Sequence, residues 1–144
     1  MIALASDHGG LSLKNAVKNY LESQGLEVRD FGTNSPESCD YPDFGAPAAR
    51  AVAEGTCERG ILICTTGIGM SMVANKIPGI RCALCHDLMS ARLTRQHNDT
   101  NVLALGAGVV GEMLALEIVK VWLNTEFEGG RHARRIGKVM DLER

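Results

Sequence analysis

Short apolar runs alternate with longer segments of helical periodicity along the whole chain. Residues 60–64 are apolar at every position, which is typical of a strand buried on both faces of a parallel sheet. Within residues 11–24, Leu13, Val17 and Leu21 recur at helical spacing, and Gly25 follows as a stop signal. The expected strands are 1–6, 27–31, 60–64, 80–85 and 101–105, and the expected helices are 11–24, 46–54, 69–75, 88–96 and 111–123.

This alternation predicts the fold class. A strand followed by a helix and a second strand forms a right-handed crossover, which makes the two strands parallel. The chain has 144 residues, the size of one domain. We therefore expect a single α/β domain over residues 1–144, a Rossmann-like three-layer α/β/α sandwich with a five-stranded parallel sheet. A basic C-terminal helix from about residue 131 is expected to complete the site. Such folds bind ligands at the carboxyl ends of their strands.

Composition narrows the function classes. Aromatic residues make up 4% of the chain and the formal net charge is −2, so neither stacking platforms nor overall charge favours a nucleic acid partner. No apolar run approaches the roughly 20 residues of a membrane span, and the apolar start is too short for a secretory signal. Five cysteines without framework spacing favour free thiols. We expect a cytoplasmic protein with no nucleic acid or membrane partner.

The segment after residues 60–64 carries the most informative chemistry. Cys64 ends the expected strand, and the glycine-bearing segment 65–71 leads into a helix N-terminus. Backbone amides of such a loop form an anion-binding nest, and their positive field favours a thiolate. The thiol is thereby poised to act beside a bound negative charge. The alternative is a buried core cysteine before a tight turn.

Several familiar motifs do not fit. No lysine follows the glycines of this loop as a Walker A motif requires, and Met72 stands where a dinucleotide fingerprint needs a third glycine. A cysteine phosphatase would need an arginine at position 70, which is Met70. Residues 82–86 match the C-x-x-C-H haem pattern, but they read as a strand, so core packing is favoured over haem or zinc.

Three further segments offer polar chemistry. Asp7 and His8 directly follow the first strand, where they are either proton-handling groups or a helix cap with a surface histidine. His97 lies at a helix end, where both of its protonation states are accessible near neutral pH. Arg131 and Arg135 share one helical face, which suits a phosphate, or else they belong to a solvated basic tail.

Together these segments resemble the ribose-5-phosphate isomerase B family, which also contains isomerases of six-carbon sugar phosphates. The resemblance runs essentially end to end. It rests on S-D-H-G-G at 6–10, D-Y-P-D-F-G at 40–45, I-L-I-C-T-T-G-I-G-M-S at 61–71, A-N-K-I-P-G-I-R at 74–81, R-Q-H-N-D-T-N at 95–101 and E-G-G-R-H at 128–132.

The resemblance implies a reaction and its catalytic residues. Cys64 would be the base that moves a proton between C2 and C1 of ribose 5-phosphate to give ribulose 5-phosphate. Backbone amides of residues 66–71 would hold the cis-enediolate intermediate that forms between the aldose and the ketose. His97 would be the acid that opens the furanose ring with help from Thr66, and Asp7 would manage hydroxyl protons.

The resemblance also implies the binding groups. His8, Arg131 and Arg135 would bind phosphate, and Asn98 would bind sugar hydroxyls. The implied substrate-binding residues are Asp7, His8, Tyr41, Thr65, Thr66, Gly67, Ile68, Gly69, Ser71, Asn98, Arg131 and Arg135. The site would lie between two subunits of a homodimer or a dimer of dimers, with neither a metal nor an organic cofactor.

Two positions depart from the family pattern. The family usually has glycine where Thr65 stands and often has an arginine where Gly108 stands. Both departures bear on substrate size and phosphate affinity more than on the type of reaction. The alternatives are an isomerase of a six-carbon substrate, such as allose or galactose 6-phosphate, and a non-catalytic binder of sugar phosphates.

Overall fold

A single parallel sheet organises the chain. The computed structural model describes residues 1–143, and Arg144, the last residue of the predicted domain, lies outside the described residues. The strands are β1 (Ile2–Ser6), β2 (Val28–Asp30), β3 (Arg59–Cys64), β4 (Cys82–Leu84) and β5 (Val102–Gly106). They are all parallel and lie in the order β2-β1-β3-β5-β4. The predicted five-stranded parallel sheet is confirmed.

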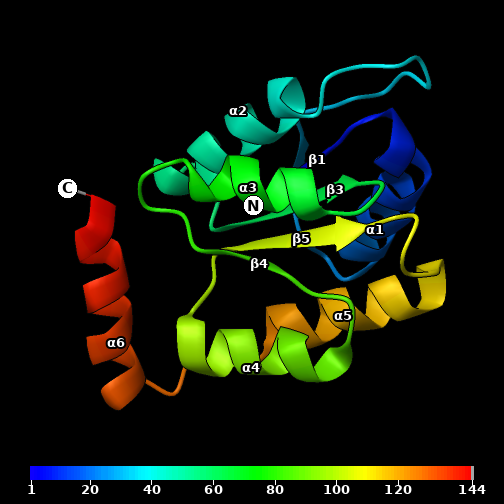
Figure 1. The fold of residues 1–144 in the computed structure, drawn as a ribbon. Coiled ribbons are helices and arrows are strands. Elements are labelled where there is room, and N and C mark those ends of the chain that lie inside the picture. Colours follow the sequence, from blue (N-terminus) through cyan, green and yellow to red (C-terminus); the bar gives the residue numbers. More distant parts are fainter. Residues whose placement is uncertain (144) are drawn as a thin grey trace.

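Helices cover both faces of this sheet (Figure 1). The α-helices are α1 (Leu11–Ser23), α2 (Pro42–Ala53), α3 (Ile68–Asn75), α4 (Leu88–Asn98), α5 (Glu112–Asn124) and α6 (Arg131–Met140), and two 3₁₀ turns are η1 (His8–Gly10) and η2 (Asp141–Glu143). Helices α2 and α3 lie on one face, whereas α1, α4 and α5 lie on the other. None of the helices within residues 1–143 is long and apolar enough to cross a membrane.

Side chains along the central strands point alternately to the two faces of the sheet. They build two apolar cores, one on each face. Leu4, Ile61 and Ile63 are buried against the α1 and α5 side, together with the indole of Trp122. Cys64 is buried on the α2 and α3 side. Burying one such aliphatic side chain contributes roughly 1.5–3 kcal/mol, so the central strands give the loops that follow them a firmly packed base.

Most element boundaries differ from the prediction by one or two residues, and the start of α2 differs by four. Helix α2 begins at Pro42 instead of residue 46, because proline needs no amide partner in the first turn and its fixed φ suits that position. Strand β4 covers only three of the residues 80–85. Asp87 caps the N-terminus of α4, since its carboxylate accepts a hydrogen bond from the Ser90 amide at 2.6 Å.

The strand order creates a topological switch point between β1 and β3. The chain runs outward from β1 to β2, then returns across β1 to β3 and continues to the other side. The loops that follow β1 and β3 therefore diverge and leave a crevice at the carboxyl edge of the sheet. Cys64 ends β3 at this edge and Asp7 directly follows β1.

Candidate functional site

A pocket of about 400 Å³ lies in this crevice. It is lined by residues of the loops after β1 and β3, by the start of α3 and by the residue before α2: Asp7, Tyr41, Cys64, Thr65, Thr66, Ile68, Gly69 and Met72. All of these except Met72 are predicted site residues. The crevice therefore brings together one part of the predicted site within a single chain.

The thiol of Cys64 is held by the loop that follows it. Only 5% of the residue is exposed, and the Gly67 amide donates a hydrogen bond to Sγ at 3.1 Å. Gly67 has a φ of 75°, and a Cβ there would lie 2.8 Å from the Leu105 carbonyl carbon. Only glycine fits this position, and the turn it makes aims an N–H at the sulfur. Such a donor stabilises negative charge on the sulfur.

The start of α3 supplies further donors. The Ile68 amide donates to Thr66 Oγ1 at 3.2 Å, so the Thr66 hydroxyl hydrogen is free to donate into the pocket. Amides of a first helical turn have no partner within their own helix, which leaves the Gly69 amide at the pocket wall for a bound anion. Ser71 is placed differently: its amide donates to Gly67 O and its hydroxyl to Ile68 O, inside the helix.

Asp7 and His8 are fixed by backbone bonds. The Asp7 carboxylate caps η1 by accepting from the Gly10 amide at 3.1 Å, and the same residue lines the pocket. His8 Nδ1 accepts from the Cys39 amide at 3.2 Å. His8 is exposed, and this bond places the hydrogen of the neutral ring on Nε2. The ring can thus donate outward to an anion.

Tyr41 is held at the pocket by its contact with α3 and by the anchoring of the loop that precedes it. A Cβ at Gly69 would lie 2.6 Å from Tyr41 Cζ, so the tyrosine ring rests directly on the first turn of α3. The loop that precedes Tyr41 is tied down by the fully buried Lys14, whose ammonium donates to Asp30 at 2.7 Å and to Asn34 at 2.9 Å. Buried charges of this kind hold their partners firmly because removing one leaves the other uncompensated.

The two departures from the family pattern touch each other. A Cβ at Gly108 would lie 3.0 Å from Thr65 Cγ2 and 3.1 Å from Thr65 O, and a Cβ at Gly9 would collide with Thr65 Oγ1. The Thr65 side chain therefore fills space that is open only because positions 9 and 108 are glycine. A residue larger than glycine at either position competes with Thr65.

This coupling predicts that Gly108→Arg destabilises the chain while Thr65 is present. The expected cost is about 1–3 kcal/mol, as for other overpacked sites. In a Thr65→Gly background the same substitution should cost measurably less, because the Cγ2 contact is gone. Thermal unfolding of both single variants and the double variant measures the coupling. Gly111→Arg is the control, since a Cβ there meets nothing within 4 Å. Strictly additive effects would contradict the prediction.

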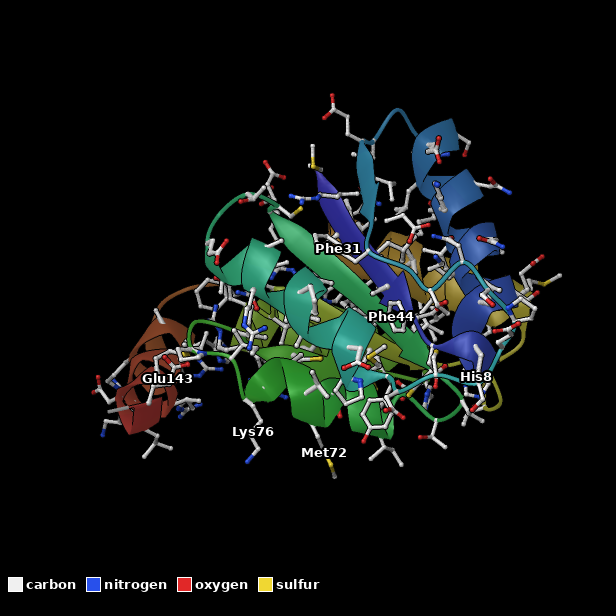
Figure 2. The ribbon with its side chains drawn as sticks, turned by 90° about the horizontal axis from the view of Figure 1, so that it is seen from above. His8, Phe31, Phe44, Met72, Lys76 and Glu143 are labelled. Carbon is white, nitrogen blue, oxygen red and sulfur yellow. The ribbon has the colours of Figure 1, made fainter. Side chains whose placement is uncertain are left out.

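The other predicted residues lie at the opposite edge of the sheet. His97 and Asn98 end α4 and precede β5, while Arg131 and Arg135 lie on α6. Cys64 pairs with Gly106 at the far end of β5, four residues beyond Val102. At about 3.3 Å per residue, the two edges are about 13 Å apart. In Figure 1 the strand β5 points away from α6. Figure 2 shows His8 and Glu143 on opposite sides of the molecule.

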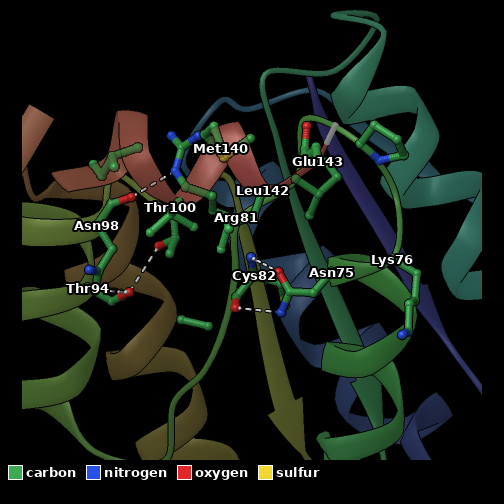
Figure 3. A pocket seen from close by; sticks show the side chains of 15 residues that line it. Asn75, Lys76, Arg81, Cys82, Thr94, Asn98, Thr100, Met140, Leu142 and Glu143 are labelled. Carbon is green, nitrogen blue, oxygen red and sulfur yellow. Dashed lines mark hydrogen bonds between the residues drawn. The ribbon is translucent and has the colours of Figure 1, made fainter. Parts of the chain in front are cut away.

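Asn98 is oriented by a polar network in the lining of a larger cleft of about 680 Å³ (Figure 3). Thr94 Oγ1 lies 3.3 Å from Asn98 Oδ1, and the Arg81 guanidinium donates to the Asn98 carbonyl at 2.9 Å. The Asn98 amide group is left to donate outward. The apolar face of α6 and η2 closes the cleft with Ile136, Val139, Met140 and Leu142. Because Cys64 does not line it, this cleft alone cannot carry the predicted reaction.

His97 belongs to a cluster that sequence reasoning did not find. Its ring stacks on His132 at 4.3 Å with a 12° interplanar angle, and Glu128 Oε1 lies 3.6 Å from Nε2 of each histidine. The three ligand atoms lie within 4.8 Å of one another, a spacing that a metal ion could use. Nearly parallel rings, however, direct their lone pairs side by side instead of toward one point, so the arrangement is poorly shaped for a shared ion.

A doubly wound parallel sheet with a thiol and a helix N-terminus at its switch point defines an α/β protein suited to a small anionic substrate. A family model described as Ribose/Galactose Isomerase matches residues 2–139. The chain belongs to this family. Both the predicted family and the predicted class of enzyme, an aldose–ketose isomerase, are confirmed.

Individual relatives agree with this assignment. The structure of ribose-5-phosphate isomerase B from Clostridium thermocellum is 56% identical, has a TM-score of 0.97 and covers 99% of this chain and 96% of that chain. Ribose-5-phosphate isomerase B of Escherichia coli is 49% identical over 142 residues, which are 99% of this chain and 95% of the relative. D-erythrulose-4-phosphate isomerase of Pectobacterium atrosepticum is 46% identical over 139 residues, 96% of this chain and 91% of the relative.

Proposed function

We propose that this chain interconverts D-ribose 5-phosphate and D-ribulose 5-phosphate through a cis-enediolate, with Cys64 as the base. The observation that carries the proposal is the thiol at the end of β3, which accepts the Gly67 N–H bond inside a pocket that opens onto the first turn of α3. A base and a set of amide donors thus face the same small volume. General acid–base catalysis of enolisation needs both.

The chemistry follows from this placement. The Cys64 thiolate removes the C2 proton of the open-chain aldose, and the C1 carbonyl becomes the enediolate oxygen. Amides at the start of α3 and the Thr66 hydroxyl stabilise that negative charge. The protonated thiol then returns the proton to C1, while the buried Asp7 carboxylate moves the hydroxyl proton between O2 and O1. Every step of the isomerisation itself is a proton transfer, so the proposal includes no metal and no cofactor.

A second copy of the chain completes the proposed site. His97 as ring-opening acid, Asn98 as hydroxyl ligand, and Arg131 and Arg135 as phosphate ligands lie at the opposite edge of the sheet from Cys64, and the length of β5 alone separates these edges by about 13 Å. Among residues 1–143, no acidic side chain forms an ion pair with Arg131 or Arg135, so both guanidiniums are available to an anion. A homodimer, alone or within a dimer of dimers, would bring the two edges together.

Exposed apolar side chains support this assembly. Ile68 and Met72 stand exposed beside the Cys64 pocket, and Val139 and Leu142 stand exposed at the other edge. Clustered apolar exposure of this kind marks protein interaction surfaces. We also propose that the protein is cytoplasmic, because all five cysteines are free thiols, as is usual in a reducing compartment.

Rates on several aldose phosphates test the proposed substrate. We expect kcat/KM to be highest on ribose 5-phosphate and at least about tenfold lower on allose 6-phosphate and galactose 6-phosphate, since an extra hydroxymethylene must fit the same phosphate-to-thiol distance. The ketose formed is measured directly in each case. A higher kcat/KM on a six-carbon substrate would replace the five-carbon assignment, and binding without turnover of any of them would favour the non-catalytic alternative.

A further inference from the structure

The environment of His97 contains two residues with no assigned role, Glu128 and His132. They come from the segment before α6 and from its first turn, and the Glu128 amide donates to the Gln96 carbonyl at 3.1 Å, which ties this segment to the end of α4. The His132 ring covers one face of the His97 ring at 4.3 Å. Glu128 Oε1 lies equally far, 3.6 Å, from Nε2 of both rings. Two imidazoles thus face one carboxylate.

The two imidazoles differ in their access to water. The His132 side chain is 10% exposed, whereas that of His97 is 40% exposed. Burial lowers the pKa of His132, and the neighbouring charges of His97, Arg131 and Arg135 lower it further, against the opposing effect of Glu128. The neutral form of His132 is therefore favoured, and His97 is the more exposed ring of the stacked pair.

We propose that Glu128 and His132 are positioning residues that keep the His97 ring in place and keep its proton available for opening the sugar ring. This inference rests on the proposed function. The stack with His132 fixes the plane of the His97 ring, and 40% of the His97 side chain stays exposed to a ligand. The carboxylate stabilises the positive charge that a protonated imidazole carries.

These residues serve the ring-opening step, which moves one proton onto O4 and removes one from the anomeric hydroxyl. His97 donates its proton to the ring oxygen O4, the C1–O4 bond breaks with its electron pair going to O4, and the C1–O1 double bond forms as the anomeric hydroxyl loses its proton to Asp7. A substrate that cannot form a furanose does not need this step. A four-carbon aldose phosphate, whose O4 carries the phosphate, is such a substrate.

The test compares two substrates in five proteins: the parent, His97→Asn, Glu128→Gln, His132→Phe and the control Glu126→Gln. Glu126 is an exposed carboxylate two residues from Glu128. On ribose 5-phosphate we expect Glu128→Gln and His132→Phe to lower kcat about tenfold, less than the roughly 10²–10⁴-fold that the general acid itself contributes. On erythrose 4-phosphate both should stay within about twofold of the parent. Glu126→Gln should match the parent on both substrates.

A pH profile separates positioning from a purely structural role. Removing the Glu128 charge disfavours the protonated ring, so the alkaline fall in kcat/KM on ribose 5-phosphate should begin at lower pH in Glu128→Gln than in the parent. The comparison leaves unchanged His132, which stacks on His97, and also Arg131 and Arg135, whose charges act on His132. His132→Phe keeps a flat ring against His97 and reports on the loss of the imidazole alone.

The outcomes distinguish this inference from the function on which it rests. A parent that is inactive on both substrates overturns the proposed function. Equal losses of His97→Asn on both substrates overturn the ring-opening role of His97. If His97→Asn spares only the four-carbon substrate while Glu128→Gln and His132→Phe behave like the parent, the positioning role alone is wrong. Losses of these two variants that are equal on both substrates also overturn it.

Discussion

Replacing Cys64 by alanine is expected to lower kcat on ribose 5-phosphate by at least about a hundredfold, since general base catalysis contributes about 10²–10⁴-fold. KM should change little, because the thiol acts on the C2 proton and the phosphate contacts remain. Cys64→Ser is the matched variant. Its hydroxyl can still accept the Gly67 N–H bond that now reaches Sγ at 3.1 Å, but it ionises far less readily, so its kcat should also collapse.

The other cysteines provide the controls. Burial raises the pKa of Cys85 to about 11 and raises the pKa of Cys82 as well, so both stay protonated at neutral pH. Cys82→Ala and Cys85→Ala should keep kcat within about threefold of the parent, and Tm reports any loss of packing. A kcat near that of the parent in Cys64→Ala would exclude the thiol as the base.

Half of this site could be predicted from the order of elements. The apolar run 60–64 marks a central strand, and the carboxyl end of such a strand in an α/β sheet is where a ligand binds. The same rule placed Asp7, because it directly follows β1. The structure adds what periodicity cannot show, namely that the Gly67 amide points at the sulfur and that the Thr66 hydroxyl accepts from Ile68.

The other half lies beyond the reach of that rule. His97 and Asn98 precede β5, so the strand-end rule puts them at the wrong edge for a site within one chain. Glu128 and His132 are separated from His97 by more than thirty residues, and only the packing of α6 against α4 brings them together. A four-residue spacing between Glu128 and His132 was visible in the sequence, but Glu128 precedes α6 and gave no helical signal.

The packing of Thr65 shows a different limit of prediction from the sequence. Its hydroxyl and methyl groups fill the space beside Gly9 and Gly108, two positions that lie on separate loops. Each glycine taken alone in the sequence is compatible with a turn, a cap or a close approach. Only the three-dimensional contact shows that two departures from the family pattern form one coupled substitution.

Mixing two inactive variants should restore activity if the site is shared between two chains. Cys64→Ala disables the thiol edge of a chain, and His97→Asn disables its opposite edge. In a mixed dimer one site receives both substitutions, while the other receives the intact Cys64 of one chain and the intact His97 of its partner. Random reassortment of equal amounts makes half of the dimers mixed, so about a quarter of the parent activity should return.

The matched control pairs two variants of the same edge, Cys64→Ala and Asp7→Asn. In their mixed dimers every site has one damaged thiol edge, so no activity above that of the separate variants should return. The experiment uses two affinity tags to isolate mixed dimers after joint refolding, and it measures ketose formation from ribose 5-phosphate. Failure of rescue in isolated mixed dimers of the first pair would show that Cys64 and His97 do not act in one shared site. Rescue in the first pair and none in the second can arise only when the two edges of different chains meet, because within one chain about 13 Å of β5 separates them.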